Sequence, residues 1–527
     1  MIVEREDKGL IRFYKSKGIG GIFYRSFPTT EMFSIEDLSL SSRLTTKENE
    51  TLLEKLLSKS LSFTKKYFNL IDGNLNNLEN VNDLFKKVDK FLDENTRKTL
   101  YNIQSVLGHR NIGEQSNFMI SLVVPEITAL TIQDEIFISS QERSTRYVEF
   151  KENYIPNPSS PYLVNGYSIL SDLYNISFNS LSERYSKDFY DRNKRIPTEN
   201  EINTLIHPTV RDSVRSFLPM GAKTSLVMMI SARTAENIAR KLLSSDNIYN
   251  KDAGELFYSI VADNVPSLST HMKPDEFNKI VYKERIKIDD NDIKKEPYIC
   301  NLDAVNVKIK KGSQSENQLI NSICNQLSKD CKNKKETLEN YLKSVSYCRS
   351  GKFNDLNDTS IRSSFVQFEI TCSLGTARDL WRHRLSNRNI EIHLNNYIIP
   401  KNIYSDSNLM HMTYSSLKSL ISNYNELIHS GFYSDAQLLI PMATMSTLKM
   451  SMSLAEAIFI AENRSTDEAH PEYKKIAFDM YKVLKSKYPR IMDNLKVFMG
   501  NSGINKNSTE YSRINKPNIS SVNESLY

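Results

Sequence analysis

Apolar and polar positions along the chain form patterns that predict both strands and long helices. Residues 20–27 and 298–309 are mixed apolar stretches of the kind that form strands. Each is followed by a long polar segment with helical spacing, at residues 52–70 and 318–342. A helix is also expected at residues 231–243. Because this order of elements occurs twice, the pattern predicts an α+β protein built from two similar units.

The second half of the chain repeats part of the first half. The segment that begins at Pro219 aligns without gaps on the segment that begins at Pro441, and the two share Pro, Met, Leu, Met, Ser and two Ala residues. Upstream, the segment that begins at Thr128 can be set against the one that begins at Thr376. Such a repeat indicates two copies of one structural unit. We therefore expect two tandem domains, each with a small antiparallel or mixed sheet and long helices.

Changes in composition mark the expected domain boundaries. The first domain is expected over residues 1–278 and the second over residues 298–500. Between them, residues 279–297 form a charge-rich run, which we interpret as a solvated linker with one possible strand. Residues 501–527 are rich in Asn, Ser and Lys and have little apolar pattern, so this C-terminal tail is expected to pack loosely.

The overall composition excludes several kinds of site. A net charge of +6 on 527 residues does not predict a nucleic-acid-binding surface. With 16 glycines and no glycine-rich dinucleotide or P-loop motif, any phosphate must be held by side chains. Five cysteines without Cys-x-x-Cys spacing, and no His-Glu-x-x-His motif, indicate reduced thiols and no metal. The charged start of the chain and the lack of a long apolar run favour a cytoplasmic protein outside the membrane.

The clearest polar cluster of the first unit contains Glu142, Ser144 and Arg146. In an extended segment these alternate residues share one face. They offer a carboxylate acceptor, a hydroxyl and a forked guanidinium donor, a combination that suits a nucleoside monophosphate. A solvated edge strand with ordinary charge alternation is the alternative explanation.

The second unit has a basic cluster at the corresponding place, Arg382-His383-Arg384, beside the only Trp of the chain. As a binding site, the arginines would neutralise a pyrophosphate while the imidazole packs on a ring system. As a surface, they would pair with carboxylates. Arg233 and Asn237 lie four residues apart on one face of the expected helix, where they either contact a ligand or form an ion pair with a neighbouring helix.

These clusters resemble the signature of the flavin-dependent thymidylate synthases, an Arg-His-Arg triplet followed by a Glu-x-Ser-x-Arg-Tyr segment. The second unit keeps the triplet and has Ile390, Ile392 and Leu394 in place of the later Glu, Ser and Arg. The first unit is the reverse: it keeps Glu142, Ser144, Arg146 and Tyr147, and it has Asp134, Glu135 and Ile136 in place of the triplet. The signature is therefore split between the two copies.

Positions outside the signature match the same family. His109 and Glu114 resemble its Gly-His-x-x-x-x-Glu element, which contacts flavin, and Arg215 resembles its nucleotide-binding Arg ahead of a Leu-Pro pair. Arg464 matches a nucleotide-contacting Arg that the first copy lacks. Asp379 departs from the family, which usually has a Gln that contacts the nucleotide there, and a carboxylate would repel a phosphate.

The resemblance implies that the chain methylates dUMP to dTMP at a site composed from both halves. FAD is the implied cofactor, with NADPH and methylenetetrahydrofolate as co-substrates; because the cofactor carries the chemistry, no residue is expected to act as nucleophile. The implied substrate-binding residues are Glu142, Ser144, Arg146, Arg215 and Arg464. The implied cofactor-binding residues are His109, Glu114, Arg233, Asn237, Arg382, His383 and Arg384. Known members are homotetramers, so we expect a homodimer of this fused chain that forms a pseudo-tetramer.

Two other functions remain open at this point. A non-catalytic paralogue could keep flavin or nucleotide affinity for a structural or regulatory role, which the split motif and Asp379 favour. A purely structural or nucleic-acid-binding role is the third possibility, and the modest net charge argues against it.

Overall fold

The computed structural model describes residues 4–8, 11–16, 19–24, 114, 117–145, 160–264, 266–269, 271–289, 296–326, 334–345, 359–465, 469–495 and 497. The helix expected at residues 52–70, the tail at 501–527, and the site candidates His109 and Arg146 lie outside these described residues.

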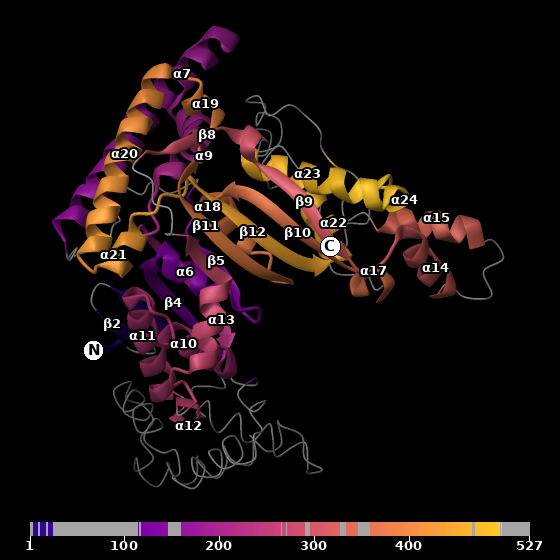
Figure 1. Ribbon diagram of the computed structural model, residues 1–527, viewed down its shortest axis with the longest axis horizontal. Helices are drawn as coiled ribbons and strands as arrows, with labels where there is room; N and C mark the ends of the chain where they lie inside the picture. The colour runs from indigo at the N-terminus through magenta and orange to yellow at the C-terminus, as the bar shows by residue number, and fades with distance from the viewer. Residues whose placement is uncertain are drawn as a thin grey trace, which may run out of the picture.

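Two sheets of corresponding topology form the framework (Figure 1). The first has the strand order β1-β2-β3-β4-β6-β5 and is antiparallel throughout. The second has the order β7-β11-β12-β10-β9, and β7 and β8 both pair in parallel with β11. The strands are β1 (Glu4–Lys8), β2 (Ile11–Ser16), β3 (Ile19–Tyr24), β4 (Asn117–Pro125), β5 (Ser139–Glu142), β6 (Lys223–Ser231), β7 (Ile286–Asp289), β8 (Tyr298–Cys300), β9 (Asn306–Gly312), β10 (Phe365–Ser373), β11 (Ser386–Ile398) and β12 (Thr444–Ser453). The path β3-β4-β6-β5 thus corresponds to β9-β10-β12-β11, which confirms the predicted fold class.

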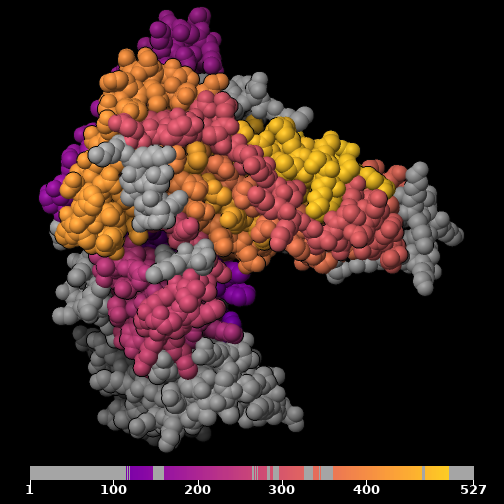
Figure 2. Space-filling view, viewed as in Figure 1, coloured from indigo at the N-terminus to yellow at the C-terminus, as the bar shows by residue number. Residues whose placement is uncertain are grey.

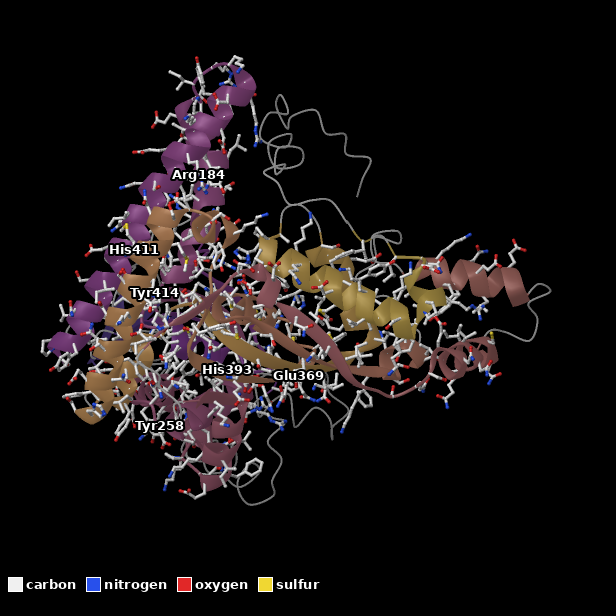
Figure 3. The ribbon with its side chains drawn as sticks, turned by 45° about the horizontal axis from the view of Figure 1, so that its top comes forward. Arg184, Tyr258, Glu369, His393, His411 and Tyr414 are labelled. Carbon is white, nitrogen blue, oxygen red and sulfur yellow. The ribbon has the colours of Figure 1, made fainter. Side chains whose placement is uncertain are left out.

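The strands follow from alternating apolar and polar residues. In β10, Val366, Phe368 and Ile370 are buried, while the residues between them are partly exposed. Glu369 lies on the outer face of this sheet together with His393 of β11 (Figure 3). The apolar face packs against helices, so one side of the sheet faces the core and the other carries polar side chains.

Each long pair of strands leads into helices at the same places in both units. Helices α6 (Glu126–Ile132) and α18 (Leu374–Trp381) follow β4 and β10, and α10 (Ala232–Leu243) and α22 (Leu454–Arg464) follow β6 and β12. Ser231 and Ser453 cap α10 and α22, because each side chain accepts a hydrogen bond from a backbone N–H of the first turn. The other helices are α7 (Pro161–Asn193), α8 (Glu199–Glu201), α9 (His207–Val214), α11 (Ile248–Asn264), α12 (Pro266–Ser269), α13 (Glu276–Arg285), α14 (Glu316–Gln326), α15 (Lys334–Ser344), α17 (Thr359–Ser363), α19 (Lys401–Tyr404), α20 (Ser407–His429), α21 (Tyr433–Leu438), α23 (Pro471–Lys487) and α24 (Pro489–Met492), with short turns η3 (Ile202–Ile206), η4 (Arg215–Phe217) and η5 (Leu302–Ala304).

The two units cross each other at the equivalent prolines of the repeat. Pro219 and Pro441 form an isolated antiparallel bridge. Around it, the N–H of Met220 donates to the carbonyl of Ile440 at 2.8 Å, and the N–H of Met442 donates to the carbonyl of Leu218 at 2.9 Å. These two hydrogen bonds are related by the register of the sequence repeat, so the crossing has approximate two-fold symmetry.

The crossing places elements of one unit on the other. Helix α7 of the first unit lies beside α20 of the second, and both stand out at one end of the molecule in the space-filling view (Figures 1 and 2). Arg184 of α7 donates to the carbonyl of Asn402 at 2.9 Å, which anchors this pair near its end (Figure 3). The largest apolar core therefore contains Phe217 from the first unit and Trp381 from the second, whereas a smaller core, with Phe257, belongs to the first unit alone.

The structure adds detail to the elements expected between residues 279 and 342. The strand expected at 298–309 is divided into β8 and β9 by η5, where the Asn301 side chain accepts from the N–H of Asp303 at 2.8 Å. Within the helix expected at 318–342, the described residues contain α14 and α15, and residues 327–333 between them lie outside the described part of the chain. Within the run interpreted as a linker, residues 279–285 continue α13, and β7 joins the second sheet because Ile286 and Ile288 alternate with polar residues.

Among the described residues, no helix combines the length and the apolar character that a bilayer crossing needs.

Candidate functional site

The candidate site lies where the two units meet, and an ion pair spans the junction. Arg215, in η4 of the first unit, donates from Nη2 to Oδ2 of Asp379, in α18 of the second unit, at 2.8 Å. Only 9% of the Arg215 side chain and 6% of the Asp379 side chain are exposed. The other amino group of Arg215 donates to Oγ1 of Thr145 at 3.5 Å. The Arg expected to bind nucleotide is therefore engaged by the residue that departs from the family.

Asp379 carries a full negative charge. Its second oxygen accepts a hydrogen bond from Arg382, three residues further along the chain. Burial acts to raise the pKa of Asp379, but the guanidinium groups of Arg215, Arg382 and Arg378 outweigh it and hold that pKa well below its usual value. Arg382 is itself 45% exposed, so the cluster reaches the surface through this side chain.

A second buried cluster lies alongside and also joins the units. Arg378 of α18 lies 3.4 Å from Glu126 and 3.4 Å from Glu142 of the first unit, and at most 3% of each side chain is exposed. Burial raises the pKa of Glu126 well above its usual value. Burial has the same tendency at Glu142, but Arg378 outweighs it and lowers that pKa. Burial therefore favours the neutral form of Glu126, whereas Arg378 favours the charged form of Glu142.

Glu142 ends β5, and its carboxylate is fixed by neighbours from its own unit. It accepts hydrogen bonds from Nε2 of Gln133 at 3.1 Å and from Oγ1 of Thr224 at 3.2 Å. Ser144 lies two residues further along the chain and is partly buried. Glu142, the first residue of the half-signature kept by the first copy, thus lies against α18, the helix that leads into the half kept by the second copy.

His383 lies in the interior of the second unit. One ring nitrogen lies 3.0 Å from the Glu456 carboxylate, and the other lies 2.6 Å from the Tyr473 hydroxyl. Burial lowers the pKa of His383, although Glu456 acts in the opposite direction, so the imidazole is neutral at pH 7. Arg464 lies over the ring of Tyr473, with its guanidinium carbon 5.3 Å from the ring centroid. Two expected site residues, His383 and Arg464, therefore share one partner, Tyr473.

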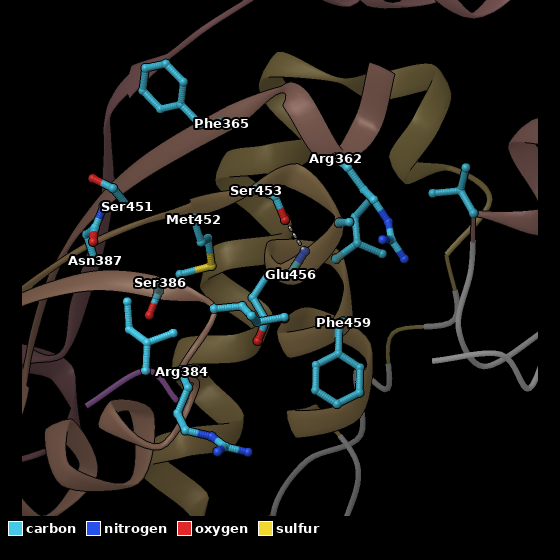
Figure 4. Close-up of a pocket in the computed structure, with 15 residues that line it drawn as sticks. Arg362, Phe365, Arg384, Ser386, Asn387, Ser451, Met452, Ser453, Glu456 and Phe459 are labelled. Atoms are coloured by element: carbon cyan, nitrogen blue, oxygen red, sulfur yellow. Dashed lines mark hydrogen bonds between the residues drawn. The ribbon is translucent and has the colours of Figure 1, made fainter. Parts of the chain in front are cut away.

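A cavity of about 740 Å³ opens at the end of the second sheet (Figure 4). Arg384, from the turn after α18, and Arg362, from α17, both line it. Its wall is largely apolar and aromatic, and the lining residues include Ile136, Val345, Phe365, Leu385, Met452 and Phe459. The guanidinium groups can bind an anionic group and the apolar wall can accept a ring system, the two chemistries that a flavin dinucleotide offers, while the Glu456 carboxylate also lines the cavity.

The remaining flavin candidates lie on the first unit. Arg233 of α10 forms an ion pair with Glu114 at 3.0 Å, and both side chains are more than 40% exposed. Asn237 accepts a hydrogen bond from Arg240 at 3.0 Å. Neither Arg233 nor Asn237 lines the cavity described above, whereas their repeat partners, Ala455 and Phe459, do. One chain therefore does not bring all of the predicted cofactor residues together.

The symmetry-related place in the first unit is closed by ion pairs. Asp134, the repeat partner of Arg382, lies 2.9 Å from Lys241 and 2.6 Å from Arg285. Arg388 donates to its backbone carbonyl at 3.2 Å and stacks over Trp381. Burial opposes ionisation of Asp134, but Lys241 and Arg285 outweigh it and lower its pKa. Where the second copy has the first Arg of its triplet, the first copy thus has Asp134 within a buried charge cluster.

Sequence reasoning missed Glu126, Glu456 and Tyr473. Glu126 interrupts an otherwise apolar stretch, and a charged residue in such a place was a usable signal. Glu456 and Tyr473 sit in ordinary amphipathic helices, so their spacing gave no sign that both contact His383.

Comparison with known proteins identifies the repeated unit. The profile of the family described as "Thymidylate synthase complementing protein" matches residues 68–253 and 307–490. Two solved structures of the UMP/dUMP methylase PolB from Streptomyces cacaoi are similar to part of the chain. The one bound with 5-Br UMP is 15% identical, with a TM-score of 0.29, and the match covers 38% of this chain and 96% of that chain. The one bound with 5-Br dUMP is 15% identical, with a TM-score of 0.30, and covers 37% and 96%.

A comparison with curated proteins gave no match. The family profile matches two separate regions that together exceed half of the sequence. The chain therefore belongs to the thymidylate synthase complementing protein family and contains two copies of its domain in tandem.

Proposed function

We propose that the chain is a flavin-dependent methyltransferase that converts dUMP to dTMP at the junction between its two units. One observation carries the proposal: Arg378 and Asp379, just ahead of the Arg-His-Arg triplet of the second copy, contact Glu142 and Arg215 of the first copy. The segments that carry the two halves of the split signature thus contact each other within one chain, which supports the proposal. The family membership supports the same reaction class.

In this proposal the chain's own residues bind and orient the reactants. Arg215, Arg464, Ser144 and Arg146 bind the nucleotide by charge and hydrogen bonds, and Arg378 keeps Glu142 in its place beside them. Arg384 and Arg362 hold the pyrophosphate of FAD in the 740 Å³ cavity. When bound there, FAD would supply hydride chemistry for the methyl group, with NADPH as the reductant and methylenetetrahydrofolate as the one-carbon donor.

We further propose that two chains associate as a pseudo-tetramer. Arg233, Asn237 and Glu114 lie together on the first unit, away from the residues that line the cavity of their own chain. In the association of two chains, these side chains and His109 of one chain complete the flavin site of the other.

The proposal is tested with the full-length protein. The visible spectrum after addition of FAD reports flavin binding, and tritium release from dUMP labelled at C5, in the presence of methylenetetrahydrofolate and NADPH, reports the reaction. We expect both signals. Arg384→Ala is expected to weaken FAD binding roughly ten- to hundred-fold, because it removes a charge-assisted hydrogen bond, whereas Arg184→Ala, on α7, serves as the matched control and leaves it unchanged. A protein that binds no flavin contradicts the proposal.

A second candidate function is a non-catalytic paralogue that binds flavin or nucleotide. The buried ion pair between Arg215 and Asp379 favours it, because the Arg expected on the nucleotide already has an anionic partner. Flavin binding without tritium release, under conditions in which dUMP perturbs the flavin spectrum, distinguishes this function from the first.

A further inference from the structure

Asp379 lies where an anion-binding site would hold its anion. Two guanidinium groups, those of Arg215 and Arg382, donate to its two carboxylate oxygens. Thr145 adds a hydroxyl within 3.5 Å of Arg215. Two forked donors and a hydroxyl around one oxyanion form the usual chemistry of a phosphate site. Here the oxyanion belongs to the protein itself.

The charges around Asp379 show that its removal would leave an excess of positive charge at this place. Arg378 lies 3.4 Å from Glu126 and 3.4 Å from Glu142, so its charge is already offset within this neighbouring cluster. Arg215, Arg382 and Asp379 together carry one net positive charge. Without the Asp379 carboxylate, two guanidinium groups would face the same place with no anion between them. A phosphate monoester, which is a dianion near neutral pH, would then match their charge.

We propose that Asp379 is an internal counter-ion that competes with the phosphate of the nucleotide for Arg215, so that a nucleotide binds only as Asp379 is displaced. The inference rests on the proposed function, because it takes the composite site to bind a pyrimidine nucleotide. Asp379 thereby weakens binding of the phosphate while leaving recognition of the nucleoside part unaffected. The partly exposed Arg382 offers the route by which the carboxylate leaves, since it is bonded to Asp379 and reaches the surface.

A purely structural role for the same ion pair makes a different prediction. If Asp379 only fastens α18 to η4, its replacement lowers stability and affects all ligands alike. If Asp379 competes with phosphate, its replacement tightens binding of dUMP and leaves deoxyuridine, which has no phosphate, unchanged. The comparison of these two ligands separates the roles.

The experiment measures dissociation constants for dUMP and deoxyuridine by calorimetry on full-length wild type, Asp379→Asn and Asp379→Gln. Asp435→Asn is the matched control, because Asp435 is also a buried carboxylate but accepts from the Tyr249 hydroxyl. We expect dUMP to bind roughly ten- to hundred-fold tighter to both Asp379 variants, in proportion to the charge-assisted contacts released. The deoxyuridine affinity of both Asp379 variants is expected to stay within about two-fold of the wild-type value. Inorganic phosphate is expected to raise the melting temperature of the Asp379 variants more than that of the wild type.

Equal dUMP affinity in wild type and folded Asp379 variants overturns the proposal, as does an equal gain for deoxyuridine. If neither variant folds, the two affinities of the wild type test the proposal. It is overturned if dUMP binds more than about a hundred-fold tighter than deoxyuridine, because the phosphate then meets no competitor. If neither ligand binds any protein, the assigned site is wrong and the proposal falls with it. Missing flavin or missing tritium release, with the affinity pattern intact, contradicts the proposed reaction alone.

Discussion

Replacing Arg378 with Met tests the buried cluster that joins the two units. Arg378 lies 3.4 Å from Glu142, and both are almost completely buried. At that distance, and with an effective dielectric constant of about 20, the attraction between the two charges amounts to roughly 5 kcal/mol. Arg378→Met leaves the carboxylate of Glu142 buried without a counter-ion, and removal of one partner from a buried ion pair costs about 3–5 kcal/mol.

The loss is limited because Glu142 can take up a proton. At pH 7, protonating a carboxyl group whose ordinary pKa is 4.5 costs about 3 kcal/mol. We therefore expect Arg378→Met to lower the free energy of unfolding by about 3 kcal/mol at pH 7. In the variant the folded-state pKa of Glu142 is raised above the unfolded value. The folded state then binds the additional proton, and the stability deficit shrinks by about 1.4 kcal/mol for each pH unit between pH 7 and pH 5.

Urea unfolding at pH 7.0 and pH 5.5 measures this deficit. The double variant Arg378→Met with Glu142→Gln is the internal test, because it removes the charge that was left behind and is expected to recover most of the loss. Lys418→Met, which breaks an exposed ion pair with Glu296, is the matched control with no measurable effect. A deficit of the same size at both pH values, or no recovery in the double variant, would refute the reasoning.

Three further outcomes follow from the structure. Gly221→Ala is expected to lower stability by about 1–3 kcal/mol, because the added methyl group overlaps the Tyr167 hydroxyl, and Tyr167→Phe is expected to return part of that loss in thermal unfolding. The imidazole of His383 is expected to be neutral at pH 7 and to titrate at a lower pH than an ordinary histidine, since burial lowers its pKa; nitrogen chemical shifts of the ring measure this, and a charged ring at pH 7 would contradict it. Calorimetry is expected to find one dUMP per chain rather than two, because ion pairs around Asp134 close the symmetry-related place.

The fold was largely predictable because the repeat can be recognised in the sequence. The gap-free alignment of the segments at Pro219 and Pro441 predicted two similar units, and both the matching sheets and the two family regions confirm it. Local signals were less dependable where a short polar turn interrupts a longer pattern. Asn301 ends β8 and starts η5 through its own side chain, a contact that hydrophobic spacing does not reveal.

The sequence predicted several residues of the candidate site but not which of them contact each other. Glu142 was identified from the split signature, and Arg215 and Asp379 from positions outside it, yet the sequence could not show that Arg215 and Asp379 form one ion pair. That contact depends on how the two units cross, which periodicity does not encode. His383 was expected beside a ring system, and nothing in the sequence showed that its ring nitrogens contact Glu456 and Tyr473.

The crossing at Pro219 and Pro441 has a consequence for how the protein is made. The backbone carbonyl of Leu218 and the N–H of Met220 can form their hydrogen bonds only after Met442 and Ile440 have left the ribosome. Until then, helix α7 has no α20 to cover it, and much of the apolar surface of the first unit is exposed in the nascent chain. If the two copies were separate chains, they would have to meet by diffusion before this surface was covered. In the fused chain the partner is always the next segment to be synthesised, and assembly of the pair no longer depends on protein concentration.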